Sequence, residues 1–151
     1  MAQENLGRDL KLKLIDNRAL SIYAVEDKTR RQRAGGKMAR VNDFIAIEGR
    51  DNLGQALIAR ILTPKGELTP LGHPDYGSRL EEVIGQPNTP TTRNLAKLFI
   101  LEALKAERRV DKITDVTVTP HQTNRFLIEI AVAVIPVGAE EELALSFAVE
   151  L

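Results

Sequence analysis

The sequence predicts a small single-domain α+β protein, with a mixed or antiparallel sheet packed against about three helices. Apolar residues alternate with polar ones near the start of the chain and again after residue 112, which is typical of strands. Helical spacing occupies the middle of the chain. Because the helices are segregated from the strands instead of alternating with them, the order favours the α+β class. The length of 151 residues suits one domain.

Residues 1–42 predict an N-terminal hairpin followed by a basic loop. Residues 9–14 read DLKLKL, with leucines on one face and lysines on the other, and ALSIYAV (residues 19–25) can return beside them. Six basic residues between Lys28 and Arg40 then surround two glycines without any apolar period. We therefore expect a mobile loop over residues 26–42.

The middle segment, which begins at residue 43, predicts one short strand and three helices. DFIAIEG reads as the strand, and Asp51 is placed to cap a helix that ends at Thr63, before a proline. A shorter apolar stripe runs from Tyr76 to Ile84. The longest helix has Thr89 as its N-cap, continues to about residue 107, and has five apolar residues on one face: Ala96, Phe99, Ile100, Ala103 and Leu104.

The rest of the chain predicts three strands, at residues 113–119, 125–137 and 143–151. In the last of these, large apolar residues alternate with small or polar ones; they are Leu143, Leu145, Phe147, Val149 and Leu151. No segment after this strand covers it, so we expect a sheet edge that is available to another strand.

Composition excludes several kinds of protein. Lysine plus arginine equals aspartate plus glutamate, at 21 each, so no overall field attracts the chain to nucleic acid or to a membrane. Cysteine is absent, which removes disulfides and thiolate metal sites. No signal-peptide pattern and no span of about 20 apolar residues is present. We expect a soluble, cytoplasmic protein without a cofactor.

Residues 70–80, PLGHPDYGSRL, contain a group of side chains that catalytic sites use: His73, Asp75, Tyr76 and Ser78. A nucleophile needs a base within hydrogen-bond reach, which is itself oriented by a third group. The second histidine, His121, belongs to a different turn, and no nucleophile-elbow pattern surrounds the serine. We interpret the stretch as a connector in which Asp75 or Ser78 caps the next helix. A metal site lacks ligands, since only the histidine and the aspartate are close in sequence.

The ordered series of motifs resembles the contractile-tail baseplate wedge family. The series consists of GRDNLGQALIARILTPKGEL, then HPDYGSRLEEVIG, a long helix, and ERRVDKITDVTV with an alternating strand, and it covers residues 43–136. The most recognisable positions are Gly66, Glu67, Tyr76, Gly77 and Ser78. Members of this family initiate the sheath in myophage tails, type VI secretion systems and extracellular contractile injection systems. Residues 1–42 and 137–151 lie outside the shared pattern.

The resemblance implies a structural protein that is not an enzyme. It implies that the chain occupies a baseplate wedge in several copies of a symmetric assembly, formed in the cytoplasm and retained in the tail-like particle. Its expected partners are the sheath protein and wedge proteins, with spike or tube-hub proteins as further candidates, and no nucleic acid. The mode of pairing would be strand addition, with Leu143, Leu145, Phe147 and Val149 on the contacting strand.

The family also has a Glu-Pro-Arg motif at the end of the long helix, used to hold the wedge core. Glu107, Arg108 and Arg109 occupy the matching positions, with arginine in place of proline. The resemblance implies that these three residues contact the wedge. The arginines could equally serve the helix itself, since cations near a helix C-terminus complement its dipole.

Two alternatives stay open. Some relatives are labelled lysozyme-like, and a peptidoglycan-cleaving enzyme would use Glu67 or Asp75 as its acid. The basic run from Lys28 to Arg40 could bind nucleic acid, although it has no interleaved aromatic residues. A solvated loop, or a loop that orders against an acidic protein surface, suits the neutral chain better.

Overall fold

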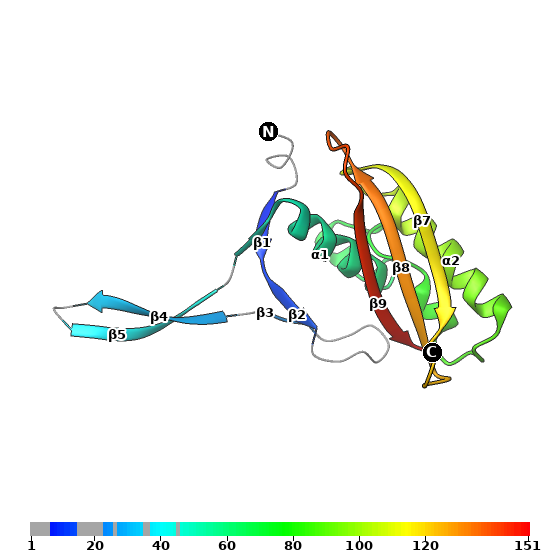
Figure 1. Cartoon of the computed structure of the whole chain (residues 1–151), viewed down its shortest axis with the longest axis horizontal. Helices are drawn as coiled ribbons and strands as arrows, with labels where there is room; N and C mark the ends of the chain where they lie inside the picture. Colours follow the sequence, from blue (N-terminus) through cyan, green and yellow to red (C-terminus); the bar gives the residue numbers. More distant parts are fainter. Residues whose placement is uncertain (1–6, 15–22, 26, 35–36, 45) are drawn as a thin grey trace.

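The computed structural model describes residues 7–14, 23–25, 27–34, 37–44 and 46–151, and the α+β class is confirmed (Figure 1). A three-stranded antiparallel sheet and two α-helices form the body of the molecule. The helices of the body are α1 (Gly49–Leu62), the 3₁₀ helices η2 (Thr69–Leu71) and η3 (Leu80–Val83), and α2 (Pro90–Lys105). Its strands are β7 (Val110–Pro120), β8 (Leu127–Pro136) and β9 (Leu143–Glu150).

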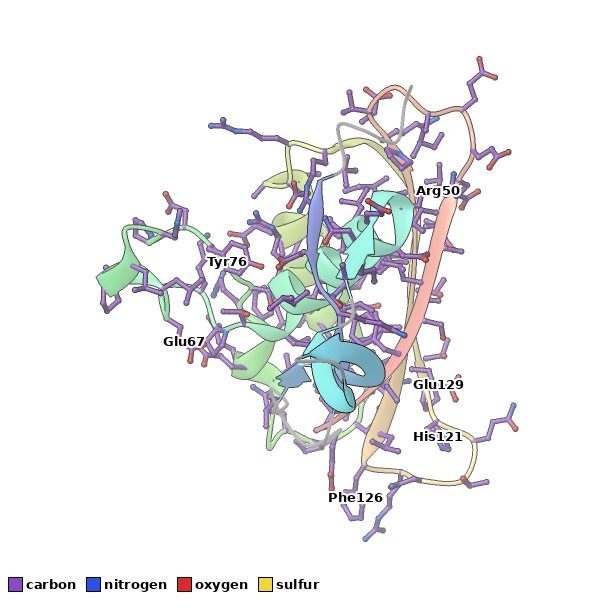
Figure 2. All side chains as sticks on the ribbon, turned by 90° about the vertical axis from the view of Figure 1, so that its left-hand side faces the viewer. Arg50, Glu67, Tyr76, His121, Phe126 and Glu129 are labelled. Carbon is purple, nitrogen blue, oxygen red and sulfur yellow. The ribbon has the colours of Figure 1, made fainter. Side chains whose placement is uncertain are left out.

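The body has two layers, because both α-helices lie on the same face of the sheet (Figures 1 and 2). Alternate residues of β8 point toward the helices and are buried, namely Ile128, Ile130, Val132 and Val134. They meet the predicted face of α2, all five residues of which are buried, and the buried leucines and isoleucine of α1. Gly54 lets α1 approach β9 closely, since a Cβ atom there would lie 3.0 Å from Leu145 Cδ2.

Three N-terminal strand pairs precede the body. Strand β1 (Arg8–Leu10) pairs with β6 (Ala46–Glu48), and the predicted hairpin is present where β2 (Leu12–Leu14) pairs with β3 (Tyr23–Val25). The expected single strand over residues 9–14 is therefore divided between two partners. Residues 15–22 of the predicted hairpin lie outside the described residues.

The expectation of a loop over residues 26–42 is wrong. Strand β4 (Asp27–Ala34) pairs with β5 (Lys37–Phe44) in an unbroken antiparallel register. The absence of an apolar period does not exclude a strand pair, because the pairing itself is made by main-chain hydrogen bonds. The stronger signal was the pair of glycines between the two strands, because a two-residue Gly-Gly connection is typical of hairpins. Gly35 and Gly36 themselves lie outside the described residues.

The helices differ from expectation in two details. The apolar stripe from Tyr76 to Ile84 forms only the short helix η3, which lies between Gly77 and Gly85, and both of these glycines have positive φ angles. Helix α1 begins earlier than Asp51 implied, and its N-cap residue, Glu48, makes no side-chain capping bond. The other end of α1 at Thr63 and the Thr89 cap of α2 are confirmed, the latter accepting a hydrogen bond from the Thr92 amide at 3.2 Å.

Candidate interaction site

The stretch that suggested catalysis is a connector whose main chain is paired with the segment after α1. The Ser78 amide donates to the Thr63 carbonyl at 2.8 Å, and the Lys65 amide donates to the Ser78 carbonyl at 2.8 Å. Gly77 lies between them at a φ of 105°. A Cβ atom at this position would be 2.5 Å from the Thr63 oxygen and 2.7 Å from the Pro64 oxygen. Only glycine therefore permits the two segments to come this close.

The four candidate catalytic side chains do not form a catalytic group. Ser78 is buried, and its hydroxyl donates to the Ile61 carbonyl and accepts from the Leu80 amide at 3.1 Å. His73 and Asp75 are exposed, as is Glu67 (Figure 2). The hydroxyl that would act as nucleophile is thus already bonded on both sides. Ser78 holds the connector in place by these two bonds. The N-cap residue of η3 is Arg79, without a side-chain capping bond, so neither Asp75 nor Ser78 occupies the predicted cap position.

Glu107 forms the centre of a buried ionic cluster. Its side chain is only 9% exposed, and it accepts hydrogen bonds from Arg109 Nε at 2.9 Å, Arg109 Nη2 at 3.3 Å and Arg60 Nη2 at 3.3 Å. The Arg60 guanidinium also lies over the Tyr76 ring, 4.4 Å from its centroid. The cluster therefore joins α1, the connector and the start of β7.

Burial and charge act in opposite directions on this carboxylate. Burial raises the pKa of Glu107, but the hydrogen bonds from Arg109 and the charges of Arg109 and Arg60 outweigh it, so the pKa is lowered overall. Burial raises the pKa of Tyr76, against the influence of the Arg60 charge. Arg60 Nε is buried without a hydrogen-bond partner. Glu107 is therefore ionised in the folded protein, where it neutralises Arg60.

The three residues matched to the Glu-Pro-Arg motif consequently have different environments. Glu107 is directed inward, Arg108 is exposed, and the Arg109 side chain is 29% exposed. A partner at this position could reach the arginines but not the glutamate. Sequence reasoning did not place Arg60 in this cluster, because nothing in the pattern of α1 distinguishes an arginine whose side chain is only 13% exposed from a surface one. Contact with a wedge protein through this motif stays a prediction.

Strand β9 forms one edge of the sheet, whose order is β7-β8-β9. The Leu151 amide donates to the Phe126 carbonyl at 2.7 Å, and the register continues from Leu127↔Glu150 to Val134↔Leu143. In an antiparallel pair, main-chain groups alternate between facing the partner strand and facing away. The residues whose amides and carbonyls face outward are therefore Ala144, Ser146, Ala148 and Glu150. Within the part of the chain that the structure describes, no hydrogen bond to these outward groups is found.

Beside this edge is a groove of about 370 Å³ between α1, the N-terminal strands and β9. Apolar side chains form much of its lining, with Ile47 and Ile58 on one side and Leu143, Leu145 and Phe147 on the other. The three β9 residues are partly buried and pack against the core, whereas Val149 is only 2% exposed. The predicted partner-binding strand thus offers its main chain and three of its apolar side chains, but not the Val149 side chain.

Arg50 closes one end of the groove. It donates to the Glu142 carbonyl at 2.5 Å and forms an ion pair with Glu141 at 3.4 Å, which fixes the chain just before β9 begins (Figure 2). The opposite end of the sheet has a larger hollow of about 720 Å³, lined in part by His121, Phe126 and Leu151.

Neither a metal site nor a membrane helix occurs in the described ranges. No group of three or more histidine, cysteine, aspartate or glutamate residues there could hold a metal ion. No helix among the same residues is long and apolar enough to cross a membrane.

Comparison with known proteins shows a likeness at the level of the fold. No protein-family model matches the sequence, and no curated protein matches it. A solved structure, that of a "putative tail lysozyme" from Geobacter sulfurreducens, superimposes with a TM-score of 0.58 at 20% identity. The match covers 67% of this chain and 89% of that chain. At this identity the likeness concerns the fold, so this chain shares its fold with a protein named as a tail protein.

Proposed function

We propose that this protein is a structural component of a contractile-tail baseplate, that it is not an enzyme, and that it initiates the sheath by accepting a strand of a sheath subunit at β9. The observation that carries the proposal is the β9 edge, where four residues direct their main-chain groups outward without a hydrogen-bond partner among the described residues. Strand addition to such an edge supplies affinity through main-chain hydrogen bonds.

The groove beside β9 supports the same assignment. An added strand would lie next to α1, where alternate side chains of the partner could cover Ile58 and Phe147. Burying each apolar side chain stabilises the complex by roughly 1.5–3 kcal/mol. An edge that offers both hydrogen bonds and an apolar lining favours an extended segment with apolar residues at every second position. The shared fold with a tail protein and the ordered motif series agree with this role.

The lysozyme alternative depends on Glu67 or Asp75, and both side chains are exposed. A glycosidase acid needs an environment that raises its pKa, usually a desolvated one, opposite a second carboxylate. Purified protein incubated with peptidoglycan should therefore release no reducing sugar. Release that is lost in Glu67→Gln or Asp75→Asn would replace the structural proposal by the enzymatic one.

The decisive variant is Ser146→Pro. The Ser146 amide faces away from β8, so a proline there leaves the β8–β9 ladder intact and removes one donor from the free edge. We expect purified or reconstituted baseplates that contain this variant to start few sheaths, as counted by electron microscopy. Ser146→Val is the matched control, since it retains the amide and suits a strand.

Both variants should first show the circular dichroism spectrum and unfolding midpoint of a folded protein. Sheath polymerisation on Ser146→Pro baseplates at the level of Ser146→Val would contradict strand addition at this edge. Because both variants are first shown to be folded, a reduced number of sheaths reports the loss of strand pairing and not a loss of stability.

A further inference from the structure

The β4–β5 hairpin is a second candidate surface, distinct from β9. Its register is unbroken from Asp27↔Phe44 to Ala34↔Lys37. Figure 1 shows it extending away from the helices and the three-stranded sheet. Its two strands pack closely on each other, and neither makes extensive contact with another helix or strand within the described part of the chain.

The hairpin concentrates positive charge that the rest of the chain lacks. Six basic residues and two aspartates give β4 and β5 a net charge of +4, so the remaining residues of this neutral chain carry −4. The basic residues are Lys28, Arg30, Arg31, Arg33, Lys37 and Arg40. The charge separation divides the molecule into a basic arm and an acidic body.

An isolated hairpin of this composition is unfavourable in water. Two strands alone are at best marginally stable, and a third strand or a packing surface is normally required. Arg31 lies directly opposite Arg40 in the register, and like charges in such pairs are destabilising. A partner that supplied both a third strand and negative charge would remove both deficits.

We propose that the β4–β5 hairpin binds an extended acidic segment of a partner protein, which adds as a strand to one of its free edges. Acidic side chains at alternate positions of that segment would lie beside the arginines, and its main chain would satisfy the outer amides and carbonyls. This surface differs from the sheath-accepting edge in charge and position. It therefore provides the chain with a second, independent contact.

Two features favour protein over nucleic acid as the partner. A DNA duplex has one negative charge per roughly 1.7 Å, and the acidic body of this chain would repel such a continuous polyanion near the arm. No aromatic residue occurs between Lys28 and Arg40 to stack on bases. A short acidic strand would contact only the basic β4–β5 hairpin, so the negative charge of the rest of the chain would not repel it.

The test uses the full chain and a synthetic peptide of alternating glutamate and valine. We expect binding at low salt, measured by fluorescence anisotropy, together with slower amide hydrogen exchange within residues 27–34 or 37–44. A peptide of alternating lysine and valine should not bind. Binding without slower exchange in the hairpin, or no binding of the acidic peptide at low salt, would overturn the proposal.

Charge variants supply the controls. The triple variant Arg30→Glu, Arg31→Glu, Arg33→Glu should bind the acidic peptide about a hundredfold more weakly, because like charges are brought together. The triple change of the same residues to lysine keeps the positive charge and should therefore still bind the acidic peptide. Binding by this variant would show that three substitutions at these positions do not themselves unfold the hairpin. A DNA duplex that binds more tightly than the acidic peptide, and loses binding in the glutamate variant, would replace the protein partner by nucleic acid. Ser146→Pro should bind the peptide normally.

Discussion

The two edges of the three-stranded sheet are built differently. Strand β7 has two register irregularities, between Val110 and Lys112 and between Ile113 and Asp115, and it ends in a proline. Strand β9 pairs with β8 over eight consecutive residues without irregularity, and its single charged residue is Glu150. Bulges, charges and prolines are the devices that prevent an edge from pairing with another chain.

The difference favours β9 as the edge that would accept the proposed partner strand. Strand β7 has register irregularities and charged residues in its first half and a proline at its end, whereas β9 has none of these devices between Leu143 and Val149. An unprotected edge is a liability unless a partner strand covers it. Strand β9 can accept a partner strand only if the body is a rigid scaffold that presents it in a fixed geometry. The residues that make the body rigid are therefore the first to test.

The largest effect is expected from Glu107→Gln. The change leaves Arg60, whose side chain is only 13% exposed, without its counter-charge. Removing one partner of a buried ion pair costs about 3–5 kcal/mol in the free energy of unfolding, and we expect a loss near the lower end of that range. Urea unfolding measures this cost. Glu102→Gln is the matched control, since Glu102 forms an exposed ion pair with Lys65, and we expect its midpoint to equal that of the wild type. Equal midpoints for both variants would show that the Glu107 cluster does not stabilise the body.

Acid should weaken the same cluster. The pKa of Glu107 is lowered in the folded state, so its contribution to stability is complete above the ordinary glutamate pKa of about 4.3 and is lost as the pH falls through the lower folded value. We expect the difference in unfolding free energy between the wild type and Glu107→Gln to shrink below about pH 4. A difference that stays constant from neutral pH to strong acid would contradict the ionised cluster.

Gly77→Ala should be the next most damaging change. Its Cβ atom would overlap the Thr63 and Pro64 carbonyls, and the φ of 105° is itself unfavourable for alanine, so we expect a loss of roughly 2–4 kcal/mol. Gly72→Ala has a similar φ of 84° but meets no atom within 4 Å. It should cost only about 1 kcal/mol. Thermal unfolding of the two variants separates steric overlap from backbone strain.

The smallest effect on stability, and the sharpest on assembly, concerns two exposed residues on opposite edges. Thr117 and Ser146 flank Ala131 in the same row of the sheet, so lysine at either position meets a similar environment. Each change should alter the free energy of unfolding by less than about 0.5 kcal/mol. Ser146→Lys should reduce sheath initiation and Thr117→Lys should not. Equal reduction by both would mean that the two edges do not differ in function.

Much of the body could be predicted from local patterns. Apolar spacing predicts the buried face of α2 and the alternation in β8 and β9, because each of these elements buries one face. The Thr89 cap follows from its local sequence, a threonine before a proline. The hairpin over residues 27–44 could not be predicted by this means, because the sequence of its two strands shows no apolar alternation.

The candidate site was partly accessible to sequence reasoning. The position of β9 at an edge followed from its alternation and from its place after the last turn. Which of its amides and carbonyls face outward could be assigned only from the pairing register with β8. The Glu107 cluster required tertiary contacts, since Arg60 and Glu107 are far apart in the sequence. A charged motif at a helix end is compatible with both an internal ion pair and an exposed contact, and only burial distinguishes them.

The most direct test of strand addition at β9 is amide hydrogen exchange of the outward residues in the presence of sheath protein. By nuclear magnetic resonance, the Ala144, Ser146 and Ala148 amides should exchange rapidly in the free protein and become protected when the sheath subunit binds. The Val116 and Val118 amides on β7 should remain unchanged. Binding of the sheath subunit that leaves the three β9 amides unprotected would contradict the account.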